Sequence, residues 1–186
     1  MIVDETHRSH SLAETSEEVL ERRAVSLSLV EAGEEATDQL SLLLFRIGEE
    51  WYAVGVSAVR EIFQEYEVTA IPCVPDFILG VVNVRGEILS VTDPARIMRI
   101  GEIAETADGV KPPAIVIAND EVATALVVDE IGDITDVPFE SVEPPVSIID
   151  RAQAEFIEGS VFVGGAMVGL LKVARILEPI GTTVKH

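Results

Sequence analysis

The sequence has few of the residues on which hydrolases, metalloproteins and disulfide-rich proteins depend. Its single cysteine, Cys73, excludes an internal disulfide and is consistent with a reducing compartment. Cys73 lies between two prolines in an apolar context, which favours a buried structural thiol over a nucleophile. The three histidines, His7, His10 and His186, lie in the terminal segments, so the central region offers no imidazole as a general base or metal ligand.

Long hydrophobic runs and positive charge are also scarce. Arg85, Glu87 and Asp93 interrupt the richest apolar stretch, which stays below the roughly 18–20 residues that cross a bilayer. The charged N-terminus does not have the pattern of a secretory signal. The chain has 33 acidic residues against 13 lysines and arginines and a net charge of −20, which argues against nucleic acid or a bare membrane as partners. Its low lysine content is typical either of a high-salt cytoplasm or of a biased genomic composition.

What the sequence does contain is an internal repeat. Residues 77–98, FILGVVNVRGEILSVTDPARIM, align without gaps with residues 156–177, FIEGSVFVGGAMVGLLKVARIL, and share the glycines and most of the apolar positions. Residues 42–62 resemble residues 114–134 in the same way, so one backbone plan is used twice. The copies differ in polar residues, since the first has Asn83, Arg85 and Asp93 where the second has Phe162, Gly164 and Lys172. We therefore expect a scaffold built by both halves, with a site supplied mostly by the first.

Short runs rich in Val, Ile and Leu, separated by turn residues every 8–12 positions, predict an all-β body from about residue 39 to 180. Five or so strands per copy suit a small barrel. The expected strands are 40–47, 51–57, 81–84, 88–91, 114–118, 123–128, 161–163 and 167–171, with short helical turns at 95–100 and 173–177. Residues 102–113 have the composition of a linker between the copies. Residues 181–186 form a tail.

Residues 1–38 form a polar extension with ten acidic residues. Thr15 and Glu18 have the spacing of a capping box, which favours a helix over residues 16–28, docked on the body or on a partner. A frayed tail is the alternative.

Candidate residues for catalysis or metal binding carry little weight. Asp129, Glu130, Asp133 and Asp136 alternate with apolar residues and lack the ligand spacing and central glycine of an EF-hand loop, so a solvated face is expected there. An acid/base enzyme that uses Asp93 and Asp129 is the least favoured function, and neither a cofactor nor a metal is expected.

Other residues are suited to contacts with another protein. Arg85 occupies a turn, where it either holds the turn or pairs with Asp93, or reaches a partner's carboxylate or carbonyl. Val59 and Ile62 are either core residues or part of a groove between the copies that accepts a helix. Trp51 and Tyr52 serve either packing or an interface.

Together these motifs resemble the CheW-like family, the adaptors that couple chemoreceptors to the histidine kinase CheA. The resemblance covers about residues 40–177 and rests on three segments: LLLFRIGEEWYAVGVSAVREI, PCVPDFILGVVNVRG followed by Ile88 and Asp93, and ALVVDEIGDI. It departs from the family pattern at Val84, Pro94 and Lys172 and in the long extension.

The resemblance implies two intertwined SH3-like five-stranded barrels, the first over about 40–108 and the second over about 109–180, with a hydrophobic groove between them. The helical tip of a methyl-accepting chemoreceptor is expected to dock at the residues that match the family's receptor site: Val59, Glu61, Ile62, Gly80, Arg85 and Ile88. The regulatory domain of CheA is expected near Glu50, Trp51, Tyr52, Thr124, Ala125 and Val127. The expected protein is a cytoplasmic scaffold without enzymatic activity, recruited to membrane-associated receptor arrays. The alternative is a divergent paralogue that serves pilus motility or another pathway, or that binds only one partner.

Overall fold

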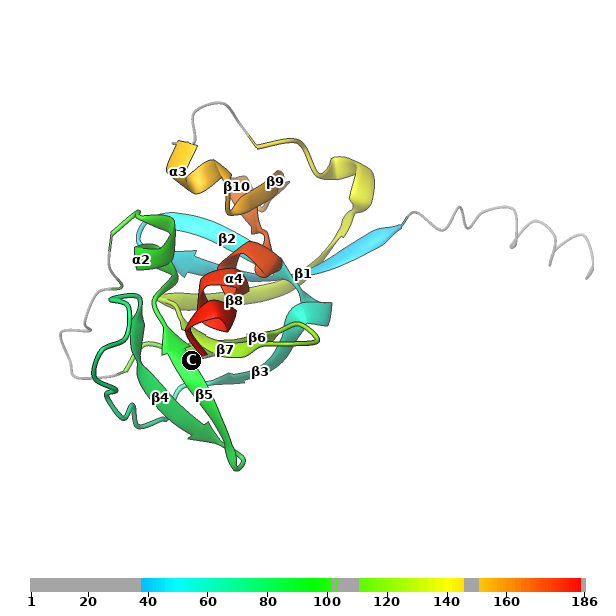
Figure 1. Ribbon diagram of the computed structural model, residues 1–186. Helices are drawn as coiled ribbons and strands as arrows, with labels where there is room; N and C mark the ends of the chain where they lie inside the picture. Colours follow the sequence, from blue (N-terminus) through cyan, green and yellow to red (C-terminus); the bar gives the residue numbers. More distant parts are fainter. Residues whose placement is uncertain (1–37, 102, 104–110, 146–150, 185–186) are drawn as a thin grey trace, which may run out of the picture. The chain divides into compact units, whose positions relative to one another are not determined.

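The computed structural model describes residues 38–101, 103, 111–145 and 151–184 (Figure 1). The predicted capping box and helix of the extension lie outside the described residues, as does most of the predicted linker. The strands are β1 (Gln39–Ile47), β2 (Glu50–Gly55), β3 (Val59–Phe63), β4 (Ile78–Val84), β5 (Glu87–Thr92), β6 (Ala114–Ala118), β7 (Ala123–Val127), β8 (Glu130–Pro138), β9 (Ile157–Val163) and β10 (Ala166–Leu171). The short 3-10 helices η1 (Val56–Ala58) and η2 (Phe139–Ser141) follow β2 and β8, and the α-helices are α2 (Pro94–Met98), α3 (Arg151–Ala154) and α4 (Val173–Val184).

The strands form two five-stranded sheets, and the all-β expectation is confirmed. Sheet A has the strand order β8-β1-β2-β10-β9, and sheet B has the order β3-β6-β7-β5-β4. Each sheet takes strands from both halves of the repeat, so the two units are intertwined. The expected division into 40–108 and 109–180 is therefore wrong for the sheets. Parallel pairing of β2 with β10 and of β5 with β7 joins the halves within each sheet.

The repeat seen in the sequence appears in the structure as an exchange of equivalent strands. The first half supplies β1–β5 and the second half supplies β6–β10 in the same order. Replacing each strand of sheet A by its counterpart turns β8-β1-β2-β10-β9 into β3-β6-β7-β5-β4, which is the order of sheet B. The two isolated bridges, Thr69 with Val81 and Glu143 with Ser160, obey the same equivalence. The duplication therefore specifies one sheet plan twice.

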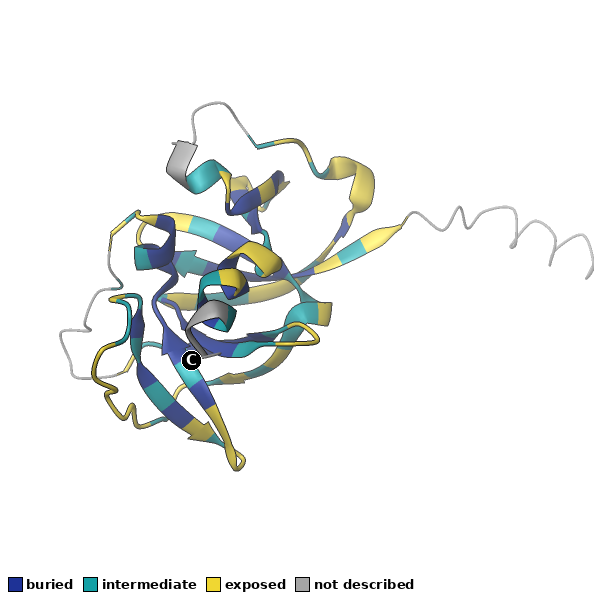
Figure 2. Ribbon diagram, in the orientation of Figure 1, coloured by how far each residue is buried: buried dark blue, intermediate teal, exposed yellow. Residues whose placement is uncertain are grey.

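The central strands are apolar on both faces because each face meets a different core. In β1, Leu42 and Leu44 point into a core within sheet A, whereas Leu43 and Phe45 point into a larger core shared with sheet B, α2 and α4. In β6, Ala114 and Val116 line the core within sheet B, and Ile115 and Ile117 join the shared core. This double burial explains the nearly continuous apolar runs of the sequence. Figure 2 shows β6 and β7 as largely buried and the β4–β5 tip as exposed.

All eight predicted strands are present, with ends shifted by a few residues. The strands β3 and β8 were not among the predicted ranges. Both are edge strands in which charged residues interrupt the apolar ones, so their apolar signal is diluted. Asp133 and Asp136 of β8 are both exposed, which agrees with the predicted solvated position of these acids. Helix α4 extends beyond the predicted single turn. Within the described residues, no helix has the length and apolarity needed to cross a bilayer.

Candidate partner-binding surface

Two ion pairs join β3 to the tip of the β4–β5 hairpin. The Arg85 Nη2 atom lies 2.8 Å from Glu61 Oε1. The guanidinium of Arg60 donates two hydrogen bonds to Glu87, at 2.7 Å and 3.2 Å, which lower the pKa of the Glu87 carboxyl below its usual value. A register shift in β3 between Val59 and Glu61 disturbs the strict alternation there, and the adjacent Arg60 and Glu61 both reach the same hairpin tip. We call Arg60, Glu61, Arg85 and Glu87 the charged clasp.

The turn that presents Arg85 has a backbone that favours glycine. Arg85 has φ 53° and Gly86 has φ 89°, and Val84 pairs with Glu87 across this two-residue turn, as in a type I′ hairpin. The second copy has Gly164 and Gly165 at the equivalent turn, both with positive φ. A non-glycine residue at positive φ is uncommon and is associated with functional positions. Arg85 pairs with Glu61 and leaves its side chain 82% exposed, so the predicted alternative in which it pairs with Asp93 is wrong.

Gly80 is buried where the chain before β4 crosses that strand. It has φ 148°, and a Cβ atom at this position would lie 2.4 Å from the carbonyl oxygen of Thr69 and 2.6 Å from Val68 Cγ1. Thr69 also exchanges two backbone hydrogen bonds with Val81, at 2.8 Å and 2.9 Å. Gly80 therefore allows the segment at Val68 and Thr69 to lie against β4 beside the charged clasp, and it offers no side chain of its own to a partner.

The charged clasp borders a surface depression of about 510 Å³, whose lining includes Glu61, Arg85 and residues of the loop from Glu65 to Thr69. A second depression, of about 450 Å³, is lined in part by Ile62 of β3 and Ile131 of β8, which are edge strands of different sheets. Ile62 is 43% exposed and Ile88 is 62% exposed, so both offer apolar surface to a partner. Val59 packs against the shared core instead.

The second set of predicted residues divides into accessible and inaccessible members. Thr124, Ala125 and Val127 are buried in sheet B, and the Thr124 hydroxyl bonds to the hydroxyls of Ser90 and Thr92. These three side chains cannot contact a partner, and their inclusion in an interface is wrong. The sequence does not separate an accessible strand face from a buried one where both faces are apolar.

Glu50 and Trp51 remain available at the start of β2. The hydroxyl of Tyr52 donates a 2.6 Å hydrogen bond to Glu50, and burial of the ring raises the pKa of Tyr52 well above its usual value. Trp51 packs over Gly132, where a Cβ atom would approach its ring to 2.8 Å. A depression of about 290 Å³ runs beside these residues and reaches the exposed side chain of Met167 on β10.

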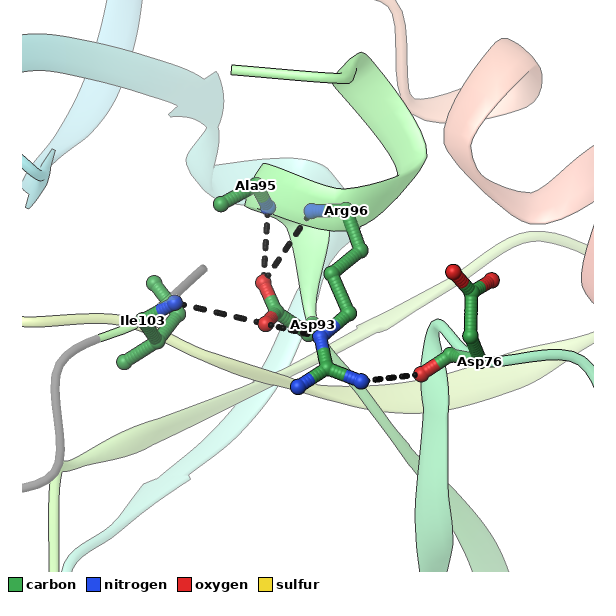
Figure 3. A network of polar contacts seen from close by, with 5 residues as sticks. All are labelled: Asp76, Asp93, Ala95, Arg96 and Ile103. Carbon is green, nitrogen blue, oxygen red and sulfur yellow. Dashed lines mark hydrogen bonds and ion pairs between the residues drawn. The ribbon is translucent and has the colours of Figure 1, made fainter. Parts of the chain in front are cut away.

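The carboxylates of Asp93 and Asp129 have structural partners. Asp93 is buried, and its Oδ1 accepts hydrogen bonds from the backbone N–H groups of Ala95 and Arg96 at the start of α2 (Figure 3). Its Oδ2 accepts from Ile103 N and lies 3.2 Å from Arg96 Nε. Asp129 accepts a hydrogen bond from the backbone N–H of Gly48. Both acids thus hold backbone segments in place.

Cys73 is exposed and has φ 61°, so the prediction of a buried thiol is wrong. The apolar neighbours of Cys73 belong to an extended surface connection rather than to the core. Among the described residues, no group of three or more His, Cys, Asp or Glu side chains is arranged to hold a metal ion.

Sequence reasoning found Glu61 and Arg85 but missed Arg60 and Glu87. A signal for the missed pair is present in the sequence. Arg60 and Glu61 are adjacent in one segment, and Arg85 and Glu87 lie two positions apart in the other, so each segment has one positive and one negative residue that can pair with the other segment. Pairing such segments requires knowing that β3 and the β4–β5 tip lie close together, and the strand order of sheet B places β3 and β4 at opposite edges.

Comparison with known proteins gives a consistent result. The CheW-like domain family matches residues 41–180. The probable chemotaxis protein CheW of Rhizobium etli is 32% identical over 138 residues, which cover 74% of this chain and 86% of that protein. The chemotaxis protein CheW of Treponema pallidum is 26% identical over 142 residues, 76% of this chain and 84% of that protein. Among solved structures, the scaffolding protein TtCheW of Thermoanaerobacter tengcongensis superposes with a TM-score of 0.64 at 26% identity, covering 72% of this chain and 88% of that one. The chain therefore belongs to the CheW-like domain family.

Proposed function

We propose that this protein is a non-enzymatic adaptor that couples methyl-accepting chemoreceptors to a CheA-type histidine kinase. The observation that carries the proposal is Arg85, a charged residue kept at a turn position that favours glycine and placed beside Glu61 at the edge of a surface depression. A backbone strained to present one exposed guanidinium is consistent with a recognition role.

The receptor surface proposed here comprises Arg85, Glu61, Ile62 and Ile88. Its apolar members supply exposed area for the helical tip of a receptor hairpin, and the ion pair supplies polar contacts that fix orientation. Gly80 and Val59 support this surface from beneath, because Gly80 is buried and Val59 packs against the shared core.

The kinase surface proposed here lies around Glu50 and Trp51 in sheet A, whereas the receptor surface belongs to strands of sheet B. Two binding surfaces on different sheets of one packed body allow both partners to bind at once. Modest affinities at each surface then suffice, because an array multiplies them through avidity. The protein is accordingly expected to act in the cytoplasm at membrane-associated receptor arrays.

The test compares the wild type with Arg85→Asn. Asparagine tolerates positive φ better than most residues, so this substitution removes the guanidinium with little strain at the turn. Arg175→Asn is the matched control, because Arg175 on α4 is also exposed and paired with two carboxylates, Glu155 and Glu178. Each protein is used to capture partners from native lysate at the salt concentration of the cell, followed by mass spectrometry and titration with the purified partners.

We expect the wild type and Arg175→Asn to recover both receptors and a CheA-type kinase. Arg85→Asn is expected to keep the kinase and to bind receptors about 5- to 150-fold more weakly, the range for loss of one central contact. Recovery of neither partner by the folded wild type would reject the adaptor function. Equal receptor affinity of Arg85→Asn and wild type would remove Arg85 from the site.

A further inference from the structure

The loop after β3 forms one wall of the depression beside the charged clasp, and it is held at two points. At one point Thr69 exchanges two backbone hydrogen bonds with Val81 of β4. At the other point Tyr66 is attached to the segment that precedes β6, which belongs to the second half of the chain. The first attachment lies within the first half of the repeat. The second ties the wall to the segment that connects the two halves, just before β6.

The attachment at Tyr66 consists of four contacts. Its hydroxyl donates a 2.8 Å hydrogen bond to the carbonyl oxygen of Pro112. Lys111 Nζ donates a hydrogen bond to the Tyr66 carbonyl oxygen at 2.5 Å and lies 5.6 Å from the centre of the Tyr66 ring. The ring also packs edge-on against Phe63 of β3, with 5.2 Å between ring centroids. The side chain of Tyr66 is thus held by β3 on one side and by Lys111 and Pro112 on the other.

Lys111 places a positive charge next to a loop that carries two negative charges. Glu65 and Glu67 flank Tyr66, both are exposed, and both line the depression that also includes Glu61. The carboxylates of Glu65 and Glu67 repel each other, which favours a more open loop. The ammonium of Lys111, which lines a second depression together with both residues, offsets that repulsion. Burial raises the pKa of Tyr66, so its hydroxyl keeps the proton that it donates to Pro112.

We infer that Lys111 and Tyr66 are positioning residues for receptor binding: they fix the Glu65–Thr69 wall beside Glu61 and Arg85, in the arrangement that a receptor helix meets. This inference rests on the proposed function. Neither residue is assigned a contact with the receptor, and their effect passes through the loop. Lys111 is one of only three lysines in the chain, and it belongs to the segment that connects the two halves.

The test uses the full chain with Lys111→Gln, Lys111→Arg and Tyr66→Phe, and Lys172→Gln as the control with the same charge change. The probes are a purified cytoplasmic hairpin of a methyl-accepting chemoreceptor from the same organism and the purified regulatory domain of its CheA-type kinase. Both affinities are measured by calorimetry, amide hydrogen exchange is followed over Glu65–Thr69, and thermal unfolding reports on the fold.

Lys111→Gln and Tyr66→Phe are expected to weaken receptor binding about three- to tenfold, the effect of losing one hydrogen bond that holds the binding conformation. Faster hydrogen exchange over Glu65–Thr69 is expected to accompany that loss, with kinase affinity unchanged. Lys111→Arg keeps the charge, a donor and the ring contact, so it should retain receptor affinity within about twofold. Lys172→Gln should match the wild type.

Wild-type receptor affinity in Lys111→Gln and Tyr66→Phe would overturn the inference while leaving the proposed function intact. Parallel losses of receptor and kinase affinity would also overturn it, because they would indicate general destabilisation. A folded wild type that binds no receptor hairpin would reject the proposed function, and the inference with it.

Discussion

Gly80 and Gly159 occupy equivalent strands, and at each of them another segment of the chain approaches within contact distance. A Cβ atom at Gly159 would lie 2.6 Å from Val142 Cγ1 and 2.9 Å from the carbonyl oxygen of Glu143. At Gly80 the approach is closer, and the positive φ adds backbone strain for any other residue. Both glycines therefore meet a steric requirement, and Gly80 also meets a conformational one because its φ is positive.

Alanine at these two positions should destabilise the fold by different amounts. Gly159→Ala is expected to cost about 1–3 kcal/mol through overpacking. Gly80→Ala adds backbone strain and is expected to cost about 2–6 kcal/mol. Gly48→Ala is the control, since Gly48 has positive φ but open space around it, and should cost about 1 kcal/mol. Urea unfolding measures all three. A loss at Gly80 no larger than at Gly48 would contradict the close crossing.

Asp93 shows how one side chain organises an element. The short helix α2 begins with Pro94, and Asp93 accepts hydrogen bonds from the two backbone N–H groups that follow, at 2.8 Å and 3.3 Å. The same carboxylate holds Ile103, beyond the helix, and pairs with Arg96. In the second copy Lys172 takes this position, and α4 is longer. The first copy thus relies on a buried cap, whereas the second relies on helix length and packing.

Removing this cap should lower the unfolding free energy of the protein in the absence of any partner. Asp93→Ala removes the acceptor of two helix N–H groups and the carboxylate that pairs with Arg96, whose guanidinium keeps its hydrogen bond to the Asp76 carbonyl oxygen. The expected cost is about 2–4 kcal/mol in unfolding free energy. Asp93→Asn keeps an oxygen acceptor for the helix and should lose less than half of that. Chemical denaturation compares the two variants with the wild type. Equal stabilities of Asp93→Ala and wild type would show that the network in Figure 3 contributes nothing.

Elements were predictable where periodicity and turn residues agree, as at the β4–β5 hairpin with its Arg85-Gly86 turn. The edge strands β3 and β8 were missed because charged residues interrupt their apolar runs. The side chains of Thr124 and Val127 were assigned to a surface because an apolar strand with two buried faces looks the same in sequence as one with an exposed apolar face. The exposure of Cys73 was not predicted for a related reason. Apolar neighbours in the sequence do not show whether another segment of the chain packs over the cysteine.

At the scale of the molecule, the repeat predicted two similar units but not which strands would form each one. Identical strand plans allow β1–β2 to join either set of partners. In the structure β1 pairs with β8, and β2 pairs with β10, both from the second half. The shared core likewise takes side chains from both sheets. Local sequence does not specify which strands pair, because the pairing joins segments more than 80 residues apart. Arg46 of β1, for example, forms a hydrogen bond with Glu130 of β8.

The exchange of strands predicts that neither half folds alone. A fragment of residues 38–106 keeps only the β1–β2 and β4–β5 hairpins, because β3 loses its partner β6 and β2 loses β10. Two-stranded hairpins are marginal in water, and the shared core would lack its second half. We expect this fragment and its complement, residues 107–186, to be unfolded separately by far-UV circular dichroism and to regain the native spectrum when mixed. The uncut chain is the control, and the mixture should co-elute at its size. Cooperative unfolding of residues 38–106 alone would show that the first half closes on itself, which would contradict the strand order of both sheets.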